Sequence, residues 1–222
     1  MLSARDAKRE VLAWHALAAL AELGFARVNL REIAQRSELS LGRIHYYFAD
    51  KVELLILAVD LYKDQFVRRI EKEIDRASTP AEVVSNFANG LALSVAEDAG
   101  VHRLWYDVRA QALFDAAFVP VVERMETRLT GILEKLLNRI ATLAGTAVMG
   151  DPTRAYFLVD ARFQRLIAAQ IAGAPLAQPD MARIITAELE YVIAATTLPL
   201  YANGSSAIAS DQLSNSSDIV GG

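Results

Sequence analysis

The sequence predicts an all-α protein of about nine helices, with a small N-terminal domain of three helices and a larger C-terminal helical bundle. Apolar side chains recur at steps of three or four residues, which is the period of an amphipathic helix. Ser, Thr, Asn or Asp precedes several of these segments, and Gly or Pro follows many of them, as helix ends require. No segment shows the strict alternation of a half-buried strand.

The first predicted helix covers residues 4–23. Ser3 can cap its N-terminus, and Gly24 follows its last turn, where glycine commonly ends a helix. Apolar residues on one side form a stripe that faces the core. These residues include Leu12, Ala16 and Leu20.

Residues 29–51 predict two short helices separated by a tight turn, followed by the start of a third helix. Asn29 can cap the first helix, and Glu32 lies at the capping-box spacing. Residues 37–39 form the turn, and Ser40 can cap the second helix. The side of the second helix that faces the core carries Leu41, Ile44 and Phe48.

The opposite side of residues 40–48 is polar and suits a nucleic-acid partner. Gly42 allows a close backbone approach, and Arg43 can bind a guanine edge or a phosphate. We expect Arg31 and Arg43 at base edges, and Lys51 at a phosphate beside free N–H groups of the next helix. The full set of candidate DNA contacts is Arg31, Ser40, Gly42, Arg43, His45, Tyr46, Tyr47 and Lys51. The alternative is a corner of two helices whose polar side chains are merely solvated.

Residues 9–55 resemble the DNA-binding domain of TetR-family transcriptional regulators. The matching positions are Arg9, Leu12, Ala16, Gly24, Phe25, Asn29, Ile33, Ala34, Ser40, Gly42, Ile44, Tyr46, Phe48, Lys51, Leu54 and Leu55. The resemblance implies a helix-turn-helix that binds double-stranded operator DNA and a helical domain for ligand binding and dimerisation. The chain departs from the family pattern at Glu38, where Gly is usual, at His45, where Tyr is usual, and at Arg43. The resemblance therefore does not predict which operator bases this chain contacts.

The rest of the chain predicts a helical body. Residues 51–76 form one long helix, whose apolar stripe includes Tyr62 and Phe66 and whose solvent face includes Lys63. Further helices are predicted at 80–96, 101–114, about 120–144, 152–173 and 180–195. The predicted divisions are a DNA-binding domain at 1–50, a ligand-binding and dimerisation domain at 51–200, and a disordered tail at 201–222, which is rich in Ser, Asn and Gly.

Composition and charge limit the function classes. The chain has no cysteine, which excludes disulfides, thiolate metal sites and cysteine nucleophiles. No segment reaches the roughly 18 uncharged apolar residues of a membrane span, and the charged N-terminus does not resemble a signal peptide, so a cytoplasmic protein is expected. The net charge is −4, divided into +2 over residues 1–51 and −6 over the remainder. A basic end on an acidic body fits a protein that presents one end to a polyanion.

The last two predicted helices, 152–173 and 180–195, are apolar around much of their circumference. Such helices lie either deep in a core or against a partner. The resemblance implies that these two helices form a homodimer as a four-helix bundle. The alternative is an ordinary buried core of a monomer.

The middle helices combine aromatic side chains with a few polar groups, a composition typical of a small-molecule pocket. The candidates for binding an unidentified effector are Phe66, Trp105, Tyr106, Arg109, Phe114 and Phe118. The same composition describes any helical core. The family usually binds a ligand in this region, which implies a pocket without identifying its residues.

The sequence contains no set of residues that indicates catalysis. The histidines at 15, 45 and 102 lie far apart, and none belongs to a Glu-x-x-His or His-Glu-x-x-His motif. The sequence also contains no P-loop. We therefore expect no enzyme activity, no cofactor and no metal. The leading hypothesis is a dimeric repressor that a small molecule releases from a palindromic operator. The alternatives are a helical small-molecule binder with a degenerate DNA-binding head, and a helical enzyme.

Overall fold

The computed structural model describes residues 3–36, 40–148 and 150–198. This part forms α1 (Ala4–Arg27), α2 (Leu30–Arg36), α3 (Leu41–Tyr47), α4 (Lys51–Arg76), α5 (Pro80–Gln111), η1 (Ala116–Phe118), α6 (Val119–Ala144), β1 (Ala147–Val148), α7 (Pro152–Ile171), α8 (Gln178–Thr196) and β2 (Thr197–Leu198). The predicted all-α class is confirmed. The expected turn at 37–39 and tail at 201–222 lie outside the described residues.

The helices begin where the sequence places capping residues. The side chains of Ser3, Ser40, Asp50 and Thr79 each accept a hydrogen bond from a backbone N–H in the first turn of α1, α3, α4 and α5. Each cap satisfies an N–H group that has no partner inside its own helix. The bounds of α4 equal the predicted bounds. These local signals therefore account for most helix starts.

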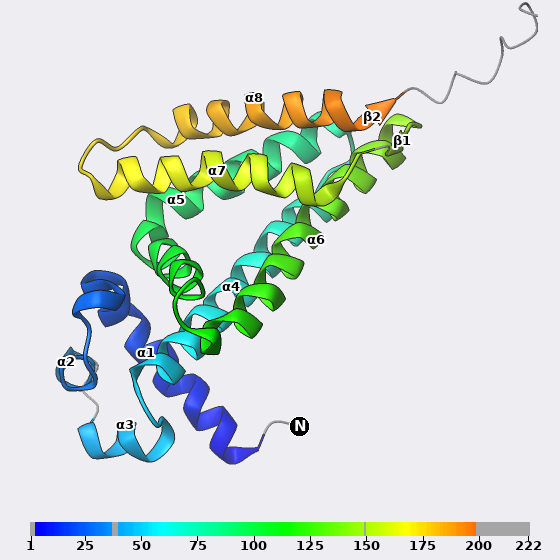
Figure 1. The fold of residues 1–222 in the computed structure, drawn as a ribbon. Coiled ribbons are helices and arrows are strands. Elements are labelled where there is room, and N and C mark those ends of the chain that lie inside the picture. The colour runs from blue at the N-terminus through cyan, green and yellow to red at the C-terminus, as the bar shows by residue number, and fades with distance from the viewer. Residues whose placement is uncertain (1–2, 37–39, 149, 199–222) are drawn as a thin grey trace, which may run out of the picture.

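The expected break at residues 97–100 is a bend within α5, so the described part has eight α-helices where the sequence predicted about nine. Only Asp98 leaves helical dihedral angles, with φ −124° and ψ 21°. Its carboxylate accepts a hydrogen bond from the Tyr62 hydroxyl at 2.8 Å. The neighbouring Ala99 is buried. α5 therefore has a kink at Asp98, where the contact with Tyr62 joins it to α4 (Figure 1).

The head, α1 to α3, lies at one end of the molecule, and α7 and α8 lie side by side at the other end (Figure 1). α4 leads from the head into the body and packs against α1, α5 and α6. α5 also packs against α1, α6, α7 and α8, so it is the central helix. One continuous apolar core runs from Leu12 in the head to Leu189 in α8. The head and the body therefore share one apolar core.

The two short strands pair antiparallel, with Ala147 opposite Leu198 and Val148 opposite Thr197. They join the end of α6 to the end of α8. A ladder of two residues per strand is too short to produce an alternating pattern, which explains why the sequence did not predict it.

The turn of α1 that precedes Gly24 is tethered to α5. Arg103 donates from Nη2 to the Ala21 carbonyl oxygen at 2.7 Å. A Cβ at Gly100 would lie 3.1 Å from the same oxygen, so the missing side chain allows the two helices to approach closely. Gly24, with φ +72°, interrupts α1 just beyond this point and faces the Arg103 guanidinium. The contact joins the head to the bend of α5.

Arg103→Ala is expected to loosen this turn of α1. The lost charge-assisted hydrogen bond contributes about 1.5 kcal/mol or more, so amides in the turn of α1 that precedes Gly24 should exchange hydrogen roughly tenfold faster. Hydrogen exchange followed by mass spectrometry measures this. Arg165→Ala, at an exposed position of α7, is the control. Equal exchange in the two variants would contradict the tether.

Candidate DNA-binding face and body cavity

The helix-turn-helix forms from local hydrogen bonds and a small apolar core. The Asn29 side chain accepts from the Glu32 N–H at 2.9 Å and donates to the Glu32 carboxylate at 2.8 Å. Ser40 accepts from the Arg43 N–H at 3.2 Å. Ile44 and Phe48 are buried. The predicted caps and the predicted inward side of α3 are thus both present, and they fix which side chains face outward.

The outward side of α3 is open. Ser40, Gly42, Arg43 and His45 are exposed, and 71% of Tyr46 is accessible. Nothing lies within 4 Å of the position that a Cβ would take at Gly42. The ring of the half-buried Tyr47 meets Tyr46 edge to face, with 4.9 Å between the ring centroids. These residues present a guanidinium, an imidazole and tyrosine hydroxyls on one surface.

The remaining two candidates lie beside α3. Arg31 is exposed on α2. Lys51 is half-buried at the start of α4 and donates to the Val28 carbonyl oxygen at 3.3 Å. The sequence interpretation placed free N–H groups here, but those of Val52 and Glu53 donate to Asp50, at 2.8 and 2.9 Å. The Lys51 ammonium, rather than the helix end, is therefore the candidate phosphate contact.

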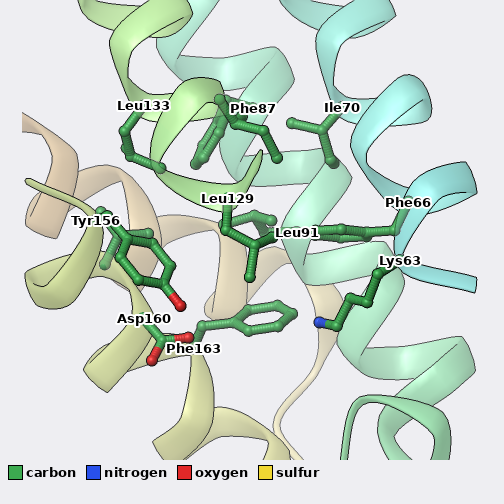
Figure 2. Close-up of a pocket in the computed structure, with 12 residues that line it drawn as sticks. Lys63, Phe66, Ile70, Phe87, Leu91, Leu129, Leu133, Tyr156, Asp160 and Phe163 are labelled. Carbon is green, nitrogen blue, oxygen red and sulfur yellow. The ribbon is translucent and has the colours of Figure 1, made fainter. Parts of the chain in front are cut away.

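A cavity of about 40 Å³ lies within the body, between α4, α5, α6 and α7 (Figure 2). Its wall is mostly apolar, and its polar groups come from α4 and α7. The lining residues are Lys63, Phe66, Ile70, Phe87, Leu91, Leu129, Ile132, Leu133, Tyr156, Val159, Asp160 and Phe163. This volume accommodates only a few water molecules.

Lys63 is the buried cation of this cavity, with 2% of its surface exposed. Its Nζ lies 3.0 Å from His102 Nδ1, and it lies 5.0 Å from the centroid of the Phe66 ring. Burial lowers the pKa of Lys63 to about 7, and the charge of Asp160 opposes that shift only in part. The ammonium form is therefore costly in the folded protein.

His102 connects Lys63 to the bend of α5. Burial, followed by the charges of Lys63 and Arg69, lowers the pKa of His102 well below its ordinary value, so the ring is neutral. Nδ1 then accepts from Lys63, and Nε2–H faces Ser94 Oγ and, at 3.1 Å, the Tyr62 hydroxyl. The Tyr62 hydroxyl donates in turn to Asp98. One chain of hydrogen bonds thus runs from the cavity to the bend.

Asp160, by contrast, has well-placed partners. It accepts from the Tyr106 hydroxyl at 2.9 Å and from Arg109 Nη1 at 2.6 Å. Arg109 Nε also lies 3.1 Å from a Glu126 oxygen. The carboxylate of Asp160 is thereby neutralised on its α5 side, although it lines the cavity.

The six predicted effector residues do not form one site. Phe66 lines the cavity, and Trp105 is buried with its ring centroid 5.9 Å from Lys63 Nζ. Tyr106 and Arg109 bind Asp160 from outside and line a surface hollow with Phe157. Phe118 is buried at η1, away from the cavity lining. Phe114 is 85% exposed, because α5 ends at Gln111 and the chain turns there, so it does not belong to the cavity.

The sequence analysis placed Lys63 on the solvent face of α4 because lysine is usually exposed. That prediction is wrong, since Lys63 is buried. Its position contained a signal: Val59, Lys63, Phe66 and Ile70 follow one another at steps of four, three and four residues. That spacing places Lys63 on the apolar side of α4.

The described part of the chain contains no group of His, Cys, Asp and Glu side chains that could bind a metal ion. Within the same residues, no helix combines the length and the apolar character that a membrane span requires.

Comparison with known proteins supports this description. The model of the family described as bacterial regulatory proteins, tetR family, matches residues 15–58, from α1 into α4. A search of curated proteins found no match. Solved structures with a similar fold include a TetR transcription regulator from Haloarcula marismortui, with TM-score 0.68 and 17% identity over 86% of this chain and 100% of that chain.

A transcriptional regulator from Rhodococcus sp. gives a TM-score of 0.68 at 19% identity, over 85% of this chain and 97% of that chain. The fatty acid degradation regulator of Bacillus halodurans gives a TM-score of 0.65 at 16% identity, over 82% of this chain and 94% of that chain. The family match covers the helix-turn-helix, and these likenesses extend the shared fold to the body. Residues 15–58 thus match the DNA-binding domain of the tetR family of bacterial regulatory proteins, and the described chain as a whole has the fold of solved TetR-type regulators.

Proposed function

We propose that this chain is a repressor that binds a palindromic operator as a homodimer in the cytoplasm and leaves it when a small molecule enters the body. The observation that carries the proposal is the open side of α3, where Arg43 and Tyr46 are exposed, together with the exposed Arg31 on α2, which packs against α3. A two-fold dimer presents two such helices to half-sites about one turn of DNA apart. Arg31 and Arg43 would contact base edges, and Lys51 a phosphate.

The proposed dimer surface is the outer side of α7 and α8. These helices lie at the end of the molecule away from α3 (Figure 1), and they expose apolar side chains. Phe157 is 45% exposed on α7, and Tyr191 is 63% exposed on α8. Exposed alanines at 161, 168, 187 and 194 would allow a second copy to approach closely.

Release would follow from movement of α4. This helix carries Lys51 at one end and Lys63 and Phe66 at the cavity. The cavity admits only a few water molecules, so a larger ligand must bind a conformation in which the surrounding helices have separated. A ligand shifts the equilibrium only by its differential affinity for the two conformations, and a preference for the expanded body would disfavour the head spacing that fits the operator.

Arg43→Ala is expected to lower operator affinity by about 1 to 3 kcal/mol and to relax selectivity at one base pair. The operator is first selected from a random DNA pool by the purified protein, and affinity is then measured by fluorescence anisotropy across a salt series. Lys72→Ala removes one exposed charge from α4 in the body and is the matched control. Unchanged affinity and base preference in Arg43→Ala would exclude Arg43 from base recognition.

The selection also tests the wider proposal. A recovered palindrome, with affinity that falls steeply as salt rises, supports a dimeric DNA binder. If a confirmed dimer enriches no sequence, with or without prior dialysis under denaturing conditions to remove bound molecules, the operator proposal fails. The head would then be degenerate, as the alternative hypothesis holds.

A further inference from the structure

Lys63 is a buried cation without a matching anion. Its ammonium group has three donors, and His102 Nδ1, at 3.0 Å, accepts one of them. In the described part of the chain, no carboxylate oxygen lies within 4 Å of Nζ; Asp160, which is bound by Arg109 and Tyr106, acts on Lys63 only from a greater distance. A fully buried, unpaired cation is rare in a folded protein, so its presence requires an explanation.

A second donor in the same cavity also lacks a partner. The Tyr156 hydroxyl is buried, which raises its pKa, and it donates no hydrogen bond of normal geometry to the described residues, although the Trp105 indole N–H lies close enough to oppose part of that rise in pKa. Figure 2 shows Lys63 entering from α4, with Tyr156 and Asp160 on α7 across the cavity. Between these polar groups the wall consists of aromatic and aliphatic side chains, among them Phe66, Leu91 and Phe163.

We infer that the effector is an apolar molecule with one carboxylate or similar acidic group, and that Lys63 binds this group inside the cavity. The inference rests on the proposed function only in treating the bound molecule as an effector. An anionic head supplies the charge that Lys63 lacks, and its second oxygen can accept from Tyr156. An apolar body fits the remaining wall, which offers almost no other polar contact.

Two other ligand chemistries fit less well. A cationic ligand would have to face Lys63 and would compete with Arg109 for Asp160, which already accepts at 2.6 Å from Arg109 Nη1. A neutral apolar ligand would leave the ammonium of Lys63 unpaired and further desolvated. The acidic group alone satisfies the cation without displacing an existing ion pair.

The same contact offers a route to the head. An acid on Lys63 competes with His102 for the ammonium, and His102 lies in the chain of hydrogen bonds that ends at Asp98. The bend at Asp98 is followed by Gly100 and Arg103, which meet the turn of α1 that precedes Gly24. Binding at Lys63 therefore acts on the segment of α5 that holds the head.

Matched pairs of acids and amides test the inference without DNA. The probes are octanoate with octanamide and 2-naphthoate with 2-naphthamide, titrated into the full chain by isothermal calorimetry. We expect the wild type to bind at least one acid about tenfold or more tightly than its amide, as a charge-assisted hydrogen bond allows. Lys63→Met should reduce that ratio to about one, whereas Lys72→Met, at an exposed position of the same helix, should preserve it.

Proton uptake provides a second measurement. With a pKa of about 7, Lys63 is mostly neutral at pH 8, so binding an acid should take up roughly 0.9 proton at pH 8 and about 0.1 at pH 6. Titrations in Tris and phosphate, which differ in ionisation enthalpy, measure this number. The charged or titratable groups that contact Lys63, or that act on its neighbours His102, Tyr156 and Asp160, are Tyr62 and Arg69 on α4, Asp98, His102, Tyr106 and Arg109 on α5, Glu126 on α6, and Tyr156 and Asp160 on α7.

The outcomes are separable from those of the operator experiment. If no acid binds, or acids bind no better than amides, or Lys63→Met keeps the preference, the inference is overturned even for a chain that binds an operator. If acids bind through Lys63 but leave the selected operator complex intact, the acid site stands and the release mechanism fails.

Discussion

Lys63→Met is expected to make the protein more stable at pH 7, raising the free energy of unfolding by about 1 to 4 kcal/mol. Methionine has a similar length and no charge, so it fills the same space beside Phe66 without the cost of burying an ammonium group. Urea denaturation of the two proteins at equal concentration measures the difference. Lys72→Met, at an exposed position on the same helix, should change stability by less than about 0.5 kcal/mol.

The extra stability of Lys63→Met over the wild type should decrease as the pH rises. The pKa of Lys63 is about 7 in the folded protein and 10.5 as its ordinary value, so the unfolded chain binds more protons between these two pH values. Wild-type stability therefore increases with pH in this range, by about 3 kcal/mol between pH 7 and pH 9.5. Lys63→Met lacks this increase, and the two unfolding curves should converge.

The comparison of wild-type and Lys63→Met stability is informative up to about pH 9.5. Burial raises the pKa values of Tyr62, Tyr106 and Tyr156 above their ordinary value of 10. The unfolded chain loses these tyrosine protons first, so stability falls above pH 10 in both proteins. Parallel curves for wild type and Lys63→Met between pH 7 and 9.5 would show that Lys63 is not a buried cation.

The exposed side of α3 was predictable because it depends on local rules. Ser40 caps α3, Ile44 and Phe48 fix its inward side, and Arg43 and Tyr46 must then face outward. Each step uses only helical spacing and one capping residue. Residues 37–39, which include the unusual Glu38, lie outside the described residues and add nothing to this comparison.

The cavity was less predictable because it depends on how helices far apart in the sequence meet. Lys63 lies at the edge of the apolar stripe of α4, and that edge is buried only because α5 and α7 cover it. Aromatic content alone selected Phe114, which the end of α5 leaves in solvent. The sequence predicted a helix break at residues 97–100, and the structure has a kink there at Asp98.

Arg109→Met should be strongly destabilising, lowering the free energy of unfolding by about 3 to 5 kcal/mol, because it leaves the carboxylate of Asp160 buried without its cation. Asp160 is only 9% exposed, and Arg109 is the one residue whose guanidinium reaches it within ion-pair distance in the described part of the chain. Urea denaturation at fixed protein concentration measures the loss. Arg76→Met, which breaks an exposed pair with Glu73 on α4, should cost less than about 1 kcal/mol.

The double variant Arg109→Met, Asp160→Asn separates the charge from the packing. If the cost of Arg109→Met comes from an unpaired carboxylate, removing both charges should cost less than removing one, as for other buried pairs. If the double variant is as unstable as the sum of the single variants, packing of Arg109 over Phe157, at 5.8 Å from the ring centroid, is the larger contribution. The comparison also bears on Lys63: Asp160, held by Arg109, opposes the lowering of the Lys63 pKa only in part, which leaves room for a ligand anion beside the ammonium.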